Sequence, residues 1–183
     1  MAVAFPENFR PLRRVEYDEL VSLGHFQNER IELINGVLVP MSLIGPRHSD
    51  AVDELTEILV GALAGVARVR VQNPLAAGDV SEPEPDIVIA PRKRYDTEHP
   101  AAAHLVIEVA ESSLEYDRST KLRLYADQGV PEYWIVDVVS RRIEVYRDPA
   151  DGTFVTKRVY ERGEAIPLLQ FPAVTVRVSD VMK

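Results

Sequence analysis

The sequence feature that most limits the possible folds is a six-residue apolar run, LVIEVA at residues 105–110, which contains a single acid, Glu108. Such a run is typical of a strand that is buried on both faces of a sheet. A carboxylate inside it is costly unless it is paired or binds a metal ion. We therefore expect a central strand in which Glu108 has a fixed partner or ligand.

Apolar periodicity and turn residues predict the elements around this strand. Asn35-Gly36, between two apolar runs, is a strong hairpin signal because both turn positions favour positive φ. We predict helices at residues 15–23, 49–63 and 117–128, the last with Asp117 as a candidate N-cap. We predict strands at residues 30–34, 37–41, 67–71, 85–90, 105–110, 130–138, 142–146, 154–160 and 174–178.

This order of elements predicts an α/β fold of the mixed α+β type, with a mixed central sheet flanked by helices. The 183 residues suit one globular domain, 1–183. Within it we expect an N-terminal helix and hairpin extension (1–45), an αβββαβ core (46–138) and C-terminal strands (139–183).

Composition excludes several classes of function. The chain has no cysteine, so it has no disulfide, no thiol nucleophile and no cysteine-rich zinc site. Residues 1–7 lack a signal-peptide pattern, and no uncharged stretch approaches the ~18 residues of a membrane span, so we expect a cytoplasmic protein with no membrane partner. The formal net charge of -8 opposes broad, non-specific binding to nucleic acid.

Two apolar strands each carry one acid: Asp86 begins residues 85–90, and Glu108 lies within 105–110. If these strands pair, at a spacing of ~4.8 Å, both carboxylates can reach one hard cation. Lys121 would follow from the next helix. This combination of two acids and a base favours Mg²⁺ or Mn²⁺, which take few protein carboxylates and complete their shell with water and phosphate oxygen.

Each of these residues also has a purely structural interpretation. Asp86 could begin a strand at the surface, and Glu108 could pair with a buried arginine. Lys121 stands four residues after Asp117, a spacing typical of an exposed helical ion pair. Glu32 alternates with apolar neighbours and could face solvent.

Two other features leave similar alternatives. His48, near a helix start, suits packing or capping, with a supporting place beside the metal site as the second interpretation. The loop residues Arg92-Lys93-Arg94 suit a solvated loop, with contact to a nucleic-acid backbone as the second.

An ordered set of motifs across most of the chain carries a resemblance to a known family. The motifs are Ile31-Glu32-Leu33-Ile34-Asn35-Gly36, His48, Pro85-Asp86, Glu108-Val109, Tyr116-Asp117-Arg118, Lys121, Tyr125-Ala126, Gly129-Val130 and Glu132-Tyr133-Trp134-Ile135-Val136-Asp137. Together they resemble the Uma-type family of putative restriction endonucleases, within the PD-(D/E)XK nuclease superfamily. The resemblance implies a restriction-endonuclease-like fold and metal-dependent phosphodiester hydrolysis.

Carried over by position, the resemblance makes Asp86 and Glu108 the metal carboxylates and Glu32 an additional acid near the site. The superfamily places its lysine two residues after the glutamate, where this chain has Ala110. Lys121 matches the lysine that this family places on the following helix instead. It can serve the site only if that helix packs over the strand ends.

The leading hypothesis is therefore a Mg²⁺- or Mn²⁺-dependent DNA endonuclease in which Lys121 serves the attacking water and Glu32 supports the site. One alternative is a catalytically inactive member of the fold that acts as a binding or assembly module, which the acidic charge favours. Another is a metal-dependent hydrolase of a different phosphoester. We expect a homodimer, because double-strand cleavage needs two sites and two-fold dimers are the commonest assembly.

Overall fold

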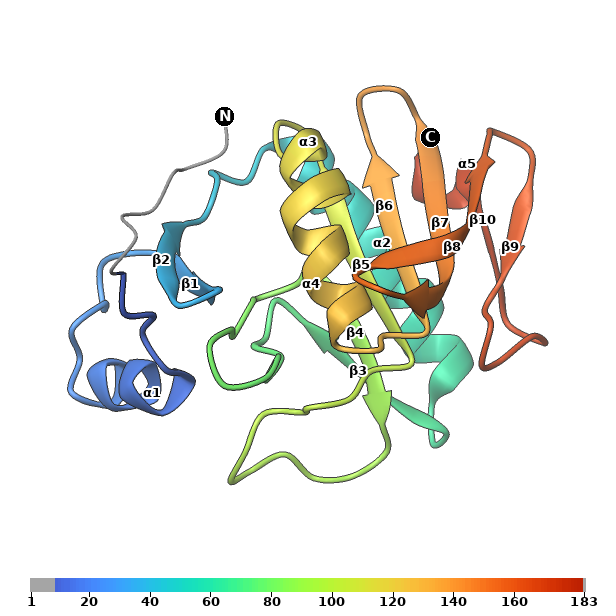
Figure 1. Ribbon diagram of the computed structural model, residues 1–183. Helices are drawn as coiled ribbons and strands as arrows, with labels where there is room; N and C mark the ends of the chain where they lie inside the picture. Colours follow the sequence, from blue (N-terminus) through green and yellow to red (C-terminus); the bar gives the residue numbers. More distant parts are fainter. Residues whose placement is uncertain (1–8, 183) are drawn as a thin grey trace.

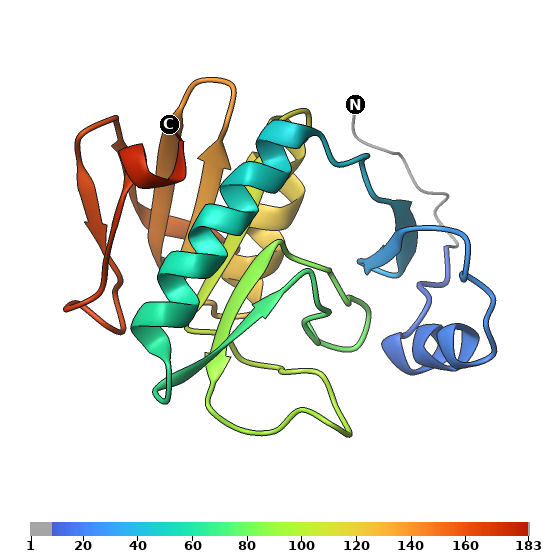
Figure 2. The same cartoon turned by 180° about the vertical axis from the view of Figure 1, so that it is seen from behind.

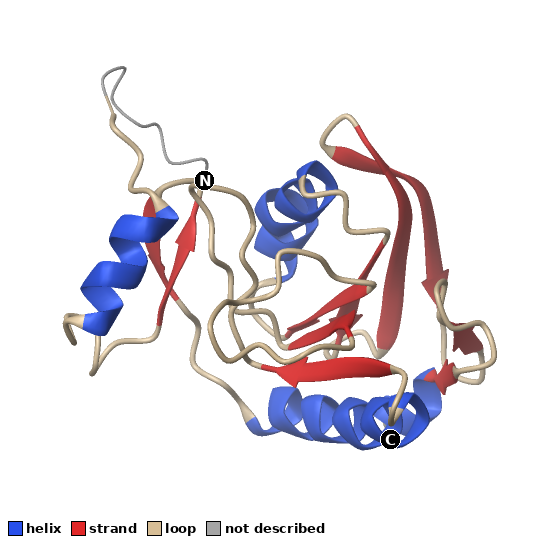
Figure 3. Ribbon diagram, turned by 90° about the horizontal axis from the view of Figure 1, so that it is seen from below, coloured by secondary structure: helices blue, strands red, loops and turns tan. Residues whose placement is uncertain are grey.

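The computed structural model describes residues 9–182 and places a mixed sheet between helices (Figure 1). Residues 1–7, where the sequence lacks a signal-peptide pattern, lie outside the described part. Seen from below, helices cover both faces of the sheet (Figure 3). The predicted mixed α+β class is confirmed. None of the helices in the described part is long and apolar enough to cross a membrane.

The elements follow the predicted order closely. The helices are α1 (Arg14–Ser22), α2 (Pro46–Leu63), α3 (Leu114–Tyr116), the π-helical turn η1 (Asp117–Lys121), α4 (Leu122–Asp127) and α5 (Val178–Val181). The strands are β1 (Ile31–Ile34), β2 (Val37–Pro40), β3 (Ala67–Val71), β4 (Ile87–Pro91), β5 (Leu105–Ala110), β6 (Glu132–Asp137), β7 (Arg142–Ala150), β8 (Thr153–Tyr160), β9 (Ala165–Pro167) and β10 (Thr175–Arg177).

Within residues 9–182, six strands form the central sheet in the order β3-β4-β5-β6-β7-β8. β5 and β6 are parallel, and the other neighbouring pairs are antiparallel. Parallel neighbours need a crossover connection, which α3, η1 and α4 supply. The predicted central strand is therefore β5, inside the sheet.

The two faces of the sheet bury different sets of side chains. α2 runs along one face (Figure 2) and packs against Ile107 and Trp134. On the opposite face, α4 buries Tyr125 against Val106 and Tyr133. Because successive side chains of a strand alternate between faces, Glu108 projects to the same side as Val106, toward the crossover helix. Trp134 and Tyr133 are both fully buried.

The N-terminal hairpin is held against the connection between β3 and β4. Asn35 and Gly36 form its turn with φ of 50° and 78°, as their sequence predicts. Leu33 and Glu82 exchange backbone hydrogen bonds of 2.7 and 3.3 Å, and Asn35 N–H donates to Ser81 Oγ at 2.8 Å. These contacts place β1 beside the chain segment that leads into Asp86.

Several predicted boundaries are wrong. The helix predicted at 117–128 begins at Leu114, and Asp117 is not its N-cap. The buried Asp117 carboxylate accepts a hydrogen bond from Ser113 Oγ at 2.6 Å inside the helical segment. At the C-terminus, the strand predicted at 174–178 ends at Arg177, since Val178 begins α5. Its partner β9 was not predicted, because three residues are too few to show a strand period.

Candidate active site

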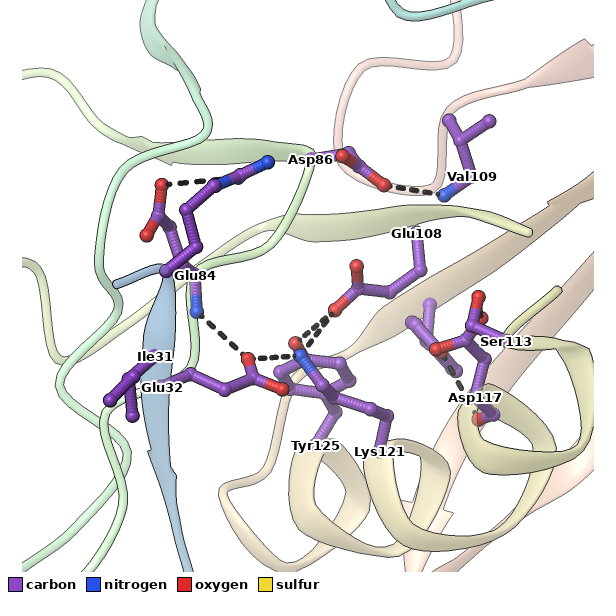
Figure 4. Close-up of polar contacts among 12 residues, drawn as sticks. Ile31, Glu32, Glu84, Asp86, Glu108, Val109, Ser113, Asp117, Lys121 and Tyr125 are labelled. Atoms are coloured by element: carbon purple, nitrogen blue, oxygen red, sulfur yellow. Dashed lines mark hydrogen bonds and ion pairs between the residues drawn. The ribbon is translucent and has the colours of Figure 1, made fainter. Parts of the chain in front are cut away.

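The two acids singled out in the sequence lie on neighbouring strands. β4 and β5 pair with Ile87 opposite Ile107, and the same register places Asp86 opposite Glu108. Residues directly opposite each other project from one face, with Cβ atoms about 4.5–5.5 Å apart. Val109 N–H also donates to Asp86 Oδ2 at 2.8 Å (Figure 4). The predicted adjacency of the two strands is confirmed.

The Asp86 carboxylate is buried and held from three directions. Besides Val109 N–H, His48 Nε2 lies 3.1 Å from Oδ2, and Gln72 Nε2 donates to Oδ1 at 3.3 Å. The surface interpretation of Asp86 is therefore wrong. His48 lies in the first turn of α2, and its hydrogen bond to Asp86 raises the pKa of its imidazole. This histidine thus links α2 to the acid that precedes β4.

Lys121 is buried, with 4% of its surface exposed, so the interpretation as an exposed ion pair with Asp117 is wrong. Its Nζ lies 2.5 Å from Glu32 Oε2 and 3.2 Å from Glu108 Oε1 (Figure 4). Lys121 ends the π-helical turn η1. Turns of this kind are frequent at functional sites. Burial opposes its positive charge, but the carboxylates of Glu108 and Glu32 outweigh that effect and raise the pKa of Lys121.

Glu108 is the most strongly perturbed acid of the group. Burial raises its pKa to about 8, and the nearby Lys121 ammonium lowers it only in part. Tyr125 donates its hydroxyl to Glu108 Oε1 at 2.5 Å, and burial raises the pKa of that phenol well above its usual value of 10.0. The partner of Glu108 is therefore a lysine and a tyrosine from the crossover helix, rather than an arginine.

Glu32 reaches the same cluster from the N-terminal hairpin. Its side chain is buried, which excludes the solvent-facing interpretation. Glu32 Oε2 accepts hydrogen bonds from Lys121 Nζ and from the Glu84 backbone N–H, the latter at 3.3 Å. Glu84 lies 3.8 Å from Arg30, and burial raises the pKa of its carboxyl. Docking of the hairpin onto residues 79–84 thus brings Glu32 across 89 positions of sequence to Lys121.

The site has three further members that were not predicted from the sequence: Tyr125, Asp117 and Glu84. Tyr125 stands four residues after Lys121, a spacing that puts both on one side of the helix, but its apolar neighbours indicated a core residue. Asp117 is buried, and burial raises its pKa to about 6. Its place in the Tyr116-Asp117-Arg118 motif was the available signal. Glu84 gave no pattern of its own.

A pocket of about 340 Å³ opens beside these residues. The acids that line it are Glu32, Glu84, Asp86, Glu108, Glu111 and Asp117, and its basic side chains are Arg30, His48 and Lys121. Among residues 9–182, no three His, Asp or Glu side chains form a ready-made ligand set for a metal ion. Mg²⁺ needs only one or two protein carboxylates, so the pair Asp86 and Glu108 fits Mg²⁺ or Mn²⁺ with water completing the shell.

The basic loop Arg92-Lys93-Arg94 lies away from this pocket. It follows β4, whereas Asp86 precedes it, so the five residues of the strand separate them by roughly 17 Å. Lys93 pairs with Glu98 at 2.8 Å and Arg94 with Asp96 at 3.1 Å. The structure thus brings together Asp86, Glu108, Lys121, Glu32 and His48, and leaves the basic loop outside.

The mixed sheet, the crossover helix and the two acids, one before β4 and one within β5, define a restriction-endonuclease-like fold. A solved structure of the same architecture is a putative nuclease belonging to DUF820 from Anabaena variabilis ATCC 29413. It aligns with a TM-score of 0.69 and 19% sequence identity, over 82% of this chain and 88% of the other. No curated protein matches the chain.

The particular family follows from the sequence itself. Residues 15–179 match the family Uma2, described as "Putative restriction endonuclease". The chain belongs to this family. The resemblance read from the sequence motifs is confirmed, and family and fold together support a nuclease.

Proposed function

We propose that this protein is a metal-dependent endonuclease that hydrolyses phosphodiester bonds of DNA. The observation that carries the proposal is the buried group formed by Asp86, Glu108 and Lys121, which joins two neighbouring strands and the crossover helix. Burying two acids opposite each other costs stability, and a divalent cation bound between them would offset that cost. Such a cation can also contact a phosphodiester.

In this proposal Asp86 and Glu108 hold Mg²⁺ or Mn²⁺. When bound, the ion would supply Lewis-acid polarisation of a phosphoryl oxygen and lower the pKa of a water molecule. Val109 N–H, His48 and Gln72 fix the orientation of the Asp86 carboxylate, so that little reorganisation is needed during catalysis.

Lys121 would act as a positioned cation. Its ammonium already balances the charge of Glu108 and Glu32 and borders the pocket. From there it can donate a hydrogen bond to the attacking water or offset negative charge that develops on the phosphoryl group. Glu32 holds the ammonium in place from the hairpin side, and Tyr125 holds the Glu108 carboxylate from the helix side.

The test combines metal binding with cleavage. Calorimetric titration with Mg²⁺ or Mn²⁺ should show binding, and supercoiled plasmid should be nicked only in its presence and not with chelator. Asp86→Asn and Glu108→Gln should lose both properties. Glu115→Gln makes the same chemical change at a side chain that is 90% exposed, on α3, and should keep both properties.

The other outcomes correspond to the alternatives. Metal binding without nicking would favour hydrolysis of a different phosphoester, and absence of both would favour a catalytically inactive binding module. We also propose a homodimer, which would supply the two sites that double-strand cleavage needs. Light scattering during size-exclusion chromatography measures the mass of the assembly. The ratio of linear to nicked plasmid shows whether both DNA strands are cut together.

A further inference from the structure

The acidic lining of the candidate active site would repel DNA, which is a polyanion. Among the described residues that line the pocket, six are acids and only Arg30, His48 and Lys121 carry basic groups. Lys121 is already paired with two of those acids. A polyanion therefore needs attractive contacts elsewhere on a chain whose formal charge is -8.

A basic cleft lies on the same face of the sheet, at its edge strand. It has a volume of about 470 Å³, and its lining residues include Arg68, Arg70, Asn73, Arg94 and Tyr95, with Asp96 as its acid. β3 supplies two of the arginines and the loop after β4 supplies the third. Three arginines against one aspartate make this cleft basic on an acidic protein.

The strand register connects this cleft to the active site. β3 pairs with β4 so that Arg70 lies opposite Val88, and the same register places Gln72 opposite Asp86. Gln72 Nε2 donates to the Asp86 carboxylate. The half-buried Val69 and Val71 pack toward the core on the α2 side of the sheet. Because side chains alternate, residues 68, 70 and 72 project from the opposite face, which carries Asp86.

The spacing suits a nucleic-acid backbone. Side chains two residues apart on a strand lie about 6.7 Å apart, so Arg68 lies about 13 Å from Gln72. One strand of DNA carries a phosphate per ~3.4 Å of helix axis, so this distance spans about four nucleotides. Residues 68, 70 and 72 therefore extend from the Asp86 site along a length that matches a short stretch of one DNA strand.

The contacts of these arginines leave guanidinium donors available for an anion. Arg70 lies over the Tyr95 ring at 5.4 Å, and Lys93 lies over the same ring at 5.0 Å. Arg70 Nε is buried and has no hydrogen-bond partner in the described structure. Arg94 is 85% exposed and pairs only with Asp96 among the contacts of the described residues. Arg68 and Arg70 each donate one hydrogen bond of 3.4 Å, to Lys93 O and to Asn73 Oδ1. Their other guanidinium donors suit phosphate oxygens.

We propose that this cleft, formed by Arg68, Arg70 and Arg94 beside Tyr95, binds the phosphodiester backbone of the DNA strand that enters the active site. The proposal rests on the proposed function for the identity of the partner. The basic loop at residues 92–94 lies outside the catalytic pocket, and its sequence suits either a solvated loop or contact with a nucleic-acid backbone. The proposal favours the second interpretation.

The test measures binding apart from cleavage. Fluorescence anisotropy of a labelled 20-nucleotide strand and its duplex, in EDTA at about 50 mM salt, compares wild type with Arg68→Gln/Arg70→Gln. We expect at least a tenfold loss of affinity, and a slope of log K against log salt reduced by roughly 1.4 to 1.8, as for two lost phosphate contacts. Arg123→Gln/Arg158→Gln removes the same charge from side chains that are 78% and 61% exposed, and should change the affinity less than twofold.

A second variant guards against a folding defect, because Arg70 packs on Tyr95. Arg94→Gln changes an exposed side chain and should weaken binding three- to tenfold at an unchanged melting temperature. Equal losses in the Arg68/Arg70 and Arg123/Arg158 pairs, or no loss in either, would overturn the proposal.

Cleavage assays keep this inference separate from the proposed function. With Mn²⁺, hydrolysis of bis(p-nitrophenyl) phosphate, which is too small to reach the cleft, should stay within twofold of wild type in the Arg68/Arg70 variant, while plasmid nicking falls. Nicking that is independent of these arginines would reject the cleft and leave the nuclease. Arginine-dependent binding without any hydrolysis would reject the nuclease and leave the cleft.

Discussion

Replacing Lys121 by methionine should destabilise the protein by an amount that grows with pH. The ammonium is buried and lies 2.5 Å from Glu32 and 3.2 Å from Glu108. With the pKa of Glu108 at about 8, the group of two carboxyls and one ammonium is neutral below that pH, since one carboxyl holds a proton. Removing the ammonium leaves one buried charge without compensation, so the second carboxyl must also be protonated in the folded state.

The magnitude follows from the cost of that proton. Protonating a carboxyl whose ordinary pKa is 4.5 costs about 1.4 kcal/mol per pH unit above that value. The expected loss of unfolding free energy is therefore about 1 kcal/mol at pH 5.5 and about 4 kcal/mol at pH 7.5. The second value agrees with the ~3–5 kcal/mol typical of breaking a buried ion pair.

The sign is fixed by the direction of the pKa shift. Burial raises the pKa of Glu108, and in the variant no ammonium remains to lower it in part. The stability that a proton on this carboxyl provides is fully present below the unfolded pKa and is lost as the pH rises through the folded one. The deficit of the variant relative to wild type must therefore widen between pH 5.5 and pH 7.5.

Thermal unfolding followed by circular dichroism, without metal, measures this deficit. At roughly 2–4 °C per kcal/mol for a chain of this length, the melting temperature should fall by about 4 °C at pH 5.5 and by about 12 °C at pH 7.5. Lys93→Met removes an exposed lysine with one carboxylate partner, and should lower it by less than about 2 °C at both pH values.

Two further measurements identify the uncompensated charge as the cause. Adding Glu32→Gln to Lys121→Met should recover most of the loss at pH 7.5, because it removes a carboxylate that has lost its partner. A divalent cation should recover part of it as well, by neutralising Glu108. Equal losses at both pH values, or no recovery with Glu32→Gln, would refute this account of the buried cluster.

Four other predictions follow from the same contacts. Glu108→Gln should raise the melting temperature of the metal-free protein by a few degrees, because it removes a carboxyl whose charge burial opposes, and should abolish stabilisation by Mg²⁺; an unchanged Mg²⁺ response would exclude Glu108 as a ligand. Lys121→Met should keep calorimetric Mg²⁺ affinity but slow single-turnover plasmid nicking by roughly 10² to 10⁴, so nicking at the wild-type rate would exclude it from the mechanism. Burial opposes the charge of Glu144, but hydrogen bonds from Arg118, Tyr146 and Lys157 lower its pKa to about 2; Glu144→Gln should therefore cost roughly 2–3 kcal/mol in urea unfolding at pH 7, a cost that disappears as the pH falls from about 4.5 to about 2. DNA binding should be weak in EDTA at physiological salt and strengthened by Mg²⁺, and tight binding in EDTA would contradict the charge argument.

The helices, the strands and the two acids at the central strands follow from local sequence patterns. Apolar runs at β4, β5 and β6 can only be interior strands, so an acid within or beside them needs a partner. Asn35-Gly36 predicted the N-terminal hairpin, because both residues adopt positive φ, of 50° and 78°. These are local properties, which a pattern of a few residues is sufficient to encode.

Which side chains meet at the site depends instead on the packing of distant elements. Lys121 follows Asp117 at the spacing of an exposed ion pair, yet η1 and the packing of α4 over the sheet turn it inward to Glu108. Glu32 looks like a solvent-facing residue of a hairpin, and it reaches Lys121 because Leu33 pairs with Glu82. Such partners depend on how distant elements pack, on strand register and on the burial that results, and no local pattern contains that information.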